Sequence, residues 1–237
     1  MADSAGGGQE AALFRAIKEQ KKIDPLAGVK IGAKELVQRL IEASKNEKGV
    51  HIDSLLAAIA SVAGFSCQMA IREAFVKTGK LTLRQALVEA ELATGEKFYF
   101  GDLLNEPLTV GQYSIWSLAG GGAQSVGCTT LPDLHEIASH CAKTVGKDNF
   151  GHPRLPEGHG LSDLPVNYVR NVWPQIRPLL EKFCDTPIHW PILLGLAAQE
   201  VIIMGKDAID PAIALTIVME CAFPSSKFDP VKLGIAF

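Results

Sequence analysis

The sequence predicts an all-α fold, namely a single-domain bundle of roughly eight to ten helices with a buried C-terminal helical hairpin. Apolar residues recur at helical spacing along most of the chain, and helix start and stop signals flank those runs. Only one short segment has the composition of a strand. We expect the domain to span residues 10–237, after a flexible tail at residues 1–9 that contains three consecutive glycines.

Composition and charge narrow the class of protein. The 47% hydrophobic and 21% charged residues exclude global disorder. The net charge of −3 offers no attraction to nucleic acid or to anionic membranes, so neither partner is expected. Five cysteines without a CxxC pair favour reduced thiols over a disulfide framework or a zinc site. Because the N-terminal residues lack the pattern of a signal peptide, we expect a cytoplasmic protein.

Two helices are predicted in the first third of the chain. Residues 34–42 place apolar and charged side chains on opposite faces, which is typical of an amphipathic helix. Asp53 has the residue type of an N-cap, and no proline follows it before Gly79, whose type is common at helix ends. Many side chains of helix 53–78 are small and let backbones approach closely. We therefore expect this helix at the centre of the bundle.

The middle of the chain gives less uniform signals. Thr82 and Gln85 have the spacing of a capping box, which predicts a helix that ends at Gly95. Residues 97–100 have the composition of a strand. Because a strand needs a partner and none is predicted, we expect an extended loop there. Residues 111–126 fit either a helix or a strand.

The second half of the chain is predicted to be helical around one long loop. An amphipathic helix covers 131–145, and the Gly- and Pro-rich segment 146–163 exceeds the usual length of a connection. Two prolines interrupt the helical stripe of 165–184, which favours a kinked helix or two successive helices. Segments 188–204 and 211–223 are apolar nearly all round and form the expected hairpin. The first contains a glutamate and the second is too short for a membrane span.

The loop 146–163 is the best candidate for a functional site, because loops held by a rigid scaffold often carry binding residues. It gathers His152, Arg154, Glu157, His159 and Asp163. An imidazole can move a proton near neutral pH, and a guanidinium can hold a carboxylate or phosphate through two hydrogen bonds. Arg170 and Glu200 would complete the ligand-binding set. The competing interpretation is a polar loop that faces solvent or an interface and binds no ligand.

Two acids lie in otherwise apolar helices. Burying the carboxylates of Glu200 and Glu220 without a partner would be costly, so each should be ion-paired, protonated or directed at a cavity. Arg170 and Arg177 are the candidate partners. We favour a structural ion pair over a ligand-binding acid.

Three further patterns resemble functional motifs but do not complete them. Asp133, Glu136 and His140 share one helix face, opposite the apolar residues, and are therefore expected to be solvated. Ser125 departs by one residue from a nucleophile elbow and lacks the parallel sheet that such an elbow needs. The glycines 120–122 lack the Lys and Ser or Thr of a phosphate-binding loop. No metal and no cofactor are therefore expected.

Two classes of function remain. The first is a soluble, non-catalytic cytoplasmic protein that acts by self-association as a homo-oligomer, or by binding a protein partner. The second is a small-molecule-binding protein or an enzyme with its site at 146–163. A ligand site would place His152, Arg154 or His159 beside a buried acid in one concave pocket. An assembly protein would spread the same side chains over a surface.

Overall fold

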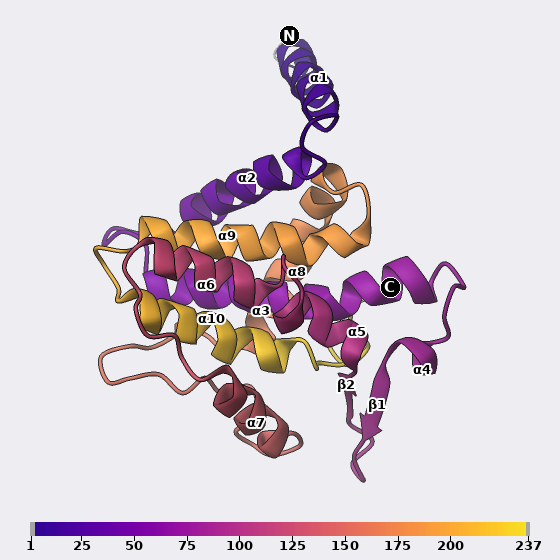
Figure 1. The fold of residues 1–237 in the computed structure, drawn as a ribbon, viewed down its shortest axis with the longest axis vertical. Coiled ribbons are helices and arrows are strands. Elements are labelled where there is room, and N and C mark those ends of the chain that lie inside the picture. Colours follow the sequence, from indigo (N-terminus) through magenta and orange to yellow (C-terminus); the bar gives the residue numbers. More distant parts are fainter. Residues whose placement is uncertain (1–2, 236–237) are drawn as a thin grey trace.

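The computed structural model describes residues 3–235 and confirms the all-α fold class (Figure 1). The α-helices of this range are α1 (Asp3–Gln20), α2 (Ala27–Ser44), α3 (Ile52–Ile71), α4 (Leu83–Ala86), α5 (Asp102–Asn105), α6 (Ile115–Ser125), α7 (Leu134–Thr144), α8 (Pro165–Phe183), α9 (Trp190–Met204) and α10 (Pro211–Ser225). The remaining elements are the π-helical turns η1 (Arg72–Val76) and η2 (Glu106–Val110), the 3-10 turn η3 (Pro187–His189), and the strands β1 (Val88–Glu91) and β2 (Lys97–Phe100).

Helix α3 forms the core of the fold, as its small side chains indicated. Every residue from Leu55 to Ile71 is buried, and α8, α9 and α10 all pack against the helix. The closest approach is at Gly64, where a β-carbon would lie 2.0 Å from the carbonyl oxygen of Ala222 in α10. Only glycine leaves room for this contact, so the small residues of α3 set the distance between the two helices.

Helix α10 is mostly buried and α9 is buried along one side, so the burial expected of this pair is confirmed in full only for α10. Asp210 caps α10 by accepting a hydrogen bond from the backbone N–H of Ala212 at 2.7 Å. Figure 1 shows α9 and α10 on opposite sides of α3. Helix α9 packs chiefly against α6 and α10 chiefly against α3, so the two helices enclose the centre of the fold more than they contact each other.

The segment after Thr82 corrects one prediction. The capping box between Thr82 and Gln85 is confirmed, but α4 ends at Ala86 instead of continuing to Gly95. Strand β1 follows and pairs antiparallel with β2, which was expected to be an unpaired loop. Residues 88–91 were predicted to be helical, but the burial of Phe98 and Tyr99 in β2 favours pairing of the two strands. Gly95, at φ +80°, lies in the turn between them.

Three other segments refine the predictions. Residues 111–126, which fitted helix or strand, form α6 with Ser114 as its N-cap. Segment 165–184 is one helix, α8, which contains both interior prolines. The N-cap of α3 is His51 and not Asp53, which lies within the first turn.

Helix α1 projects from the rest of the molecule (Figure 1). It is held near its C-terminal end, where Ile17 is buried and the ring of Phe14 lies 5.7 Å from that of Phe183. Because α1 begins at Asp3, residues 3–9 of the expected tail are helical, and residues 1 and 2 lie outside the described part of the chain.

Two stretches are long and apolar enough, by length and composition alone, to cross a membrane. They are Ile52–Val76, 94% of whose most apolar window is buried in the fold, and Pro187–Met204, for which the share is 50%. A core helix satisfies the same criterion as a membrane span, and the first stretch consists of α3 and η1. The second stretch reaches the surface along one side.

Candidate functional site

The loop 146–163 is fastened to the body of the protein by Arg154. Its guanidinium donates to both carboxylate oxygens of Glu136 in α7, at 2.6 and 2.9 Å, and to Oε1 of Glu220 in α10, at 2.5 Å. Glu220 is buried, so it has the structural ion pair that was favoured from the sequence. Its partner is Arg154; Arg177 instead binds Glu73. The guanidinium also lowers the pKa of Glu136.

A second anchor joins the loop to the start of α3. The carboxylate Oδ2 of the buried Asp53 lies 3.0 Å from Nδ1 of His159 and accepts a hydrogen bond from the backbone N–H of Gly160 at 3.2 Å. Next to it, Ser54 Oγ accepts a hydrogen bond from the backbone N–H of Ser162 at 2.9 Å. The sequence interpretation missed this role of Asp53, because a helix-capping residue and a loop anchor have the same residue type at the same position.

The remaining candidates of the loop site are only partly brought together. His152, His159 and Asp163 border one open hollow beside the loop, with Ser162 and four apolar or proline side chains. Glu157 is exposed and does not line this hollow. Arg170 is exposed and donates to the side chain of Asn167.

Glu200 is half-buried on α9, and in residues 3–235 no hydrogen bond or ion pair joins it to the loop.

The role of Arg154 in fastening the loop to α7 and α10 can be tested by substitution. Replacing Arg154 with methionine leaves the Glu220 carboxylate buried without its cation, and we expect the free energy of unfolding to fall by about 2 kcal/mol. Urea denaturation followed by tryptophan fluorescence measures the change. Arg170→Met, which removes an exposed guanidinium without an acidic partner, should change stability by less than about 0.5 kcal/mol. Equal effects of the two substitutions would contradict the anchor.

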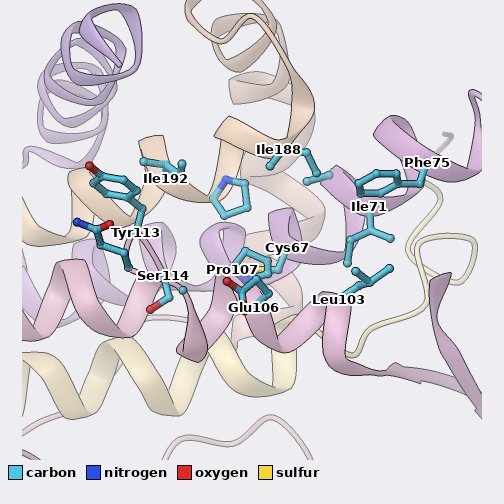
Figure 2. Close-up of a pocket in the computed structure, with 14 residues that line it drawn as sticks. Cys67, Ile71, Phe75, Leu103, Glu106, Pro107, Tyr113, Ser114, Ile188 and Ile192 are labelled. Carbon is cyan, nitrogen blue, oxygen red and sulfur yellow. The ribbon is translucent and has the colours of Figure 1, made fainter. Parts of the chain in front are cut away.

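A second hollow, which we call the apolar cleft, lies between α3, η1, the α5–η2 segment and the start of α9 (Figure 2). Its volume is about 300 Å³. Its fourteen lining residues are Cys67, Ala70, Ile71, Phe75, Leu103, Glu106, Pro107, Gly111, Gln112, Tyr113, Ser114, Ile188, Pro191 and Ile192. This volume is at the lower end of the range for ligand-binding pockets, which are also lined mostly by apolar side chains.

Two π-helical turns border the cleft. In η1 the backbone N–H of Lys77 donates to the carbonyl of Arg72, and in η2 that of Gly111 donates to the carbonyl of Glu106, both at 2.8 Å. Pro107 cannot donate a helical hydrogen bond, which is a local reason for the wider turn in η2. Such turns are rare and are frequently found at functional sites. The sequence interpretation gave no weight to either segment.

The rim of the cleft is apolar and exposed. Leu103, Tyr113 and Ile188 are 39%, 46% and 37% exposed, and each comes from a different segment of the chain. Water contact with apolar surface is unfavourable, so the rim and the cleft together form the kind of surface that marks a binding site.

The polar groups of the cleft differ in whether they already have a hydrogen-bond partner within the protein. Ser114 is buried and caps α6, because its hydroxyl accepts a hydrogen bond from the backbone N–H of Ser117 at 3.2 Å. Glu106 is exposed, and no hydrogen bond or ion pair of its side chain is found in the described part of the chain. Burial raises the pKa of the Cys67 thiol and so favours its protonated form.

No family model, no curated protein and no solved structure matches this chain. The two hollows are therefore the features of the structure that bear on function. Within residues 3–235, no group of three or more His, Cys, Asp or Glu side chains could hold a metal ion. Glu136 pairs with Arg154, and Asp133 caps α7 by accepting a hydrogen bond from the backbone N–H of Glu136, so this acidic pair serves the structure of the helix and the loop.

Proposed function

We propose that this protein is a non-catalytic binding protein that takes up a small apolar molecule in the apolar cleft. The observation that carries the proposal is the cleft itself, about 300 Å³ in volume with mostly apolar walls. A buried apolar cavity of about 150 Å³ is enough to hold benzene, so a larger hydrocarbon fits here. The proposal takes the non-catalytic role from the first class expected from the sequence and small-molecule binding from the second class, and it moves the binding site away from the loop 146–163.

The loop supports a catalytic function less well. Its arginine is engaged by two glutamates, and the acid that contacts His159, Asp53, is used to fasten the loop. The hollow between His152 and His159 is open to solvent, whereas catalytic groups act best where water is excluded. These contacts support a structural role for the loop.

The cleft also sets the affinity to expect. Burying about 200 Å² of a ligand's apolar surface contributes about 5 kcal/mol, which sets the upper limit of affinity at a Kd on the order of 0.1 mM, because association also costs translational and rotational freedom. The partly exposed rim adds contact area for ligands that extend beyond the cleft.

Titration with 1-octanol, followed by isothermal calorimetry, tests this function. We expect saturable binding, and we expect Ile192→Trp to weaken it at least about tenfold, because the larger side chain would occupy the cleft. Ile213→Trp is the matched control, since Ile213 is also half-buried on a helix but does not line the cleft. Absence of saturable binding, or equal weakening by both substitutions, would contradict the proposal.

A second candidate function is self-association through the exposed rim of the cleft, which is favoured by the exposure of Leu103, Tyr113 and Ile188. Sedimentation velocity of the wild type and of Ile192→Trp separates the two candidates. Ligand binding by a monomer supports the first, and an oligomer that dissociates when the cleft is filled supports the second. The homo-oligomeric state and the cytoplasmic location stay predictions from the sequence.

A further inference from the structure

The two halves of the apolar cleft differ in polarity. Figure 2 shows Tyr113 and Ser114 toward one end, Phe75, Ile71 and Leu103 toward the other, and Glu106 with Pro107 between them. A ligand that matches both halves therefore has a polar head and an apolar body. This distribution deepens the proposed function, on which the inference rests.

The charge of the residues that line the cleft indicates which kind of polar head group a ligand would have. Among the fourteen lining residues Glu106 is the single formally charged one, and none is Lys, Arg or His. An ionised carboxylate only accepts hydrogen bonds, so its complement is a cationic donor. No side chain in residues 3–235 supplies that donor to Glu106.

The surroundings of Glu106 favour a compact head group. A β-carbon on Gly111 would lie 2.9 Å from its Oε1, so the carboxylate lies close to the η2 turn at the cleft wall. The ring of Tyr113 lines the same cleft, and the face of an aromatic ring attracts an ammonium group. The nearby Glu73 in η1 is not available to a ligand in the same way, since it binds Arg177 and Lys77.

We propose that the ligand of the apolar cleft is an organic amine with a hydrocarbon body of about eight carbons. Its ammonium group binds the Glu106 carboxylate, and its hydrocarbon chain extends toward Phe75. The volume sets the upper limit of size, since the whole cleft of about 300 Å³ holds about ten non-hydrogen atoms at roughly 30 Å³ each.

Three probes of equal length test the inference: octylamine, 1-octanol and octanoate, each titrated at pH 7 into the wild type and into Glu106→Gln. In the wild type we expect octylamine to bind about tenfold more tightly than octanol, and octanoate to bind most weakly. In Glu106→Gln the amine and the alcohol should bind equally, with the affinity for octanol unchanged. Glu157→Gln, which removes an exposed carboxylate outside the cleft, should keep the preference for the amine.

The outcomes distinguish this inference from the proposed function. If octanol binds but octylamine binds no better, or if Glu106→Gln keeps the preference for the amine, the inference is overturned and the binding function stands. If no probe binds, both fail. Tightest binding of octanoate would also overturn the inference, and would place the head group at the other end, where Nζ of Lys80 lies 6.0 Å from the centre of the Phe75 ring.

Discussion

Replacing Gly64 with alanine is expected to lower the free energy of unfolding by about 3 kcal/mol or more. The new β-carbon would lie 2.0 Å from the carbonyl oxygen of Ala222, a distance that no relaxation of a flexible side chain can relieve. Helix α10 would have to move away from α3, and the contacts along the most closely packed interface of the core would loosen.

Urea denaturation measures this loss, with the fluorescence of the three tryptophans, of which Trp173 and Trp190 are buried, as the signal. Gly121→Ala is the matched control, because nothing lies within 4 Å of a β-carbon at that exposed helical position. Alanine is the better helix former, so the control should gain about 0.5–1 kcal/mol. A loss below about 1 kcal/mol for Gly64→Ala would mean that α3 and α10 are not in this contact.

Replacing Lys227 with methionine is expected to stabilise the protein by about 2 kcal/mol. Lys227 is buried, and burial lowers the pKa of its amine to about 8. Its Nζ lies 5.2 Å from the centre of the Phe100 ring, and the nearby groups that act on its charge are the thiols Cys141 and Cys67. Methionine has a similar length and removes the need to bury a charge.

The pH dependence of this gain follows from linkage. The unfolded chain holds the lysine proton up to its ordinary pKa of about 10.5, whereas the folded protein releases it near pH 8. Between these values the unfolded state binds more protons, so the penalty of Lys227 decreases as the pH rises. The difference in unfolding free energy between Lys227→Met and the wild type should be constant below pH 8 and should vanish toward pH 10.5. A gain that does not change with pH would contradict this origin.

The elements that could be predicted from the sequence depend on local signals. The cap at Asp210 and the capping box at Thr82 act within one helical turn, so residue type and spacing are sufficient to identify them. The central place of α3 follows from the small, uncharged side chains of a long helical run. These features can be predicted without knowing which segments of the chain contact one another.

The features that were missed depend on contacts between distant segments. The β1–β2 hairpin replaces a helix because the aromatic residues of β2 become buried against the C-terminal segment, where the backbone N–H of Tyr99 donates to the carbonyl of Lys227. Asp53 meets a loop residue 106 positions later in the chain. Neither contact has a local pattern.

The apolar cleft could not be found in the sequence for a different reason. Its walls come from separate segments, and its apolar side chains have the same residue types as the core. The loop 146–163 was the predicted site because its side chains can bind ligands or transfer protons. Their number and type do not show that Arg154 is already paired with two glutamates. Among the lining residues only Glu106, which precedes Pro107, is charged, and a single acid is too weak a signal to locate a cleft.

The order of synthesis gives the burial of α3 a further consequence. Helices α8, α9 and α10 cover α3, and all three follow it in the chain. The side chain of Gln68 in α3 also donates a hydrogen bond to the carbonyl of Ser226, 158 residues later. A ribosome therefore produces the most deeply buried helix early and the segments that enclose it later. Until translation is complete, the nascent chain carries a long uncovered apolar helix, which is the type of segment that chaperones bind and that aggregates when synthesis stops early.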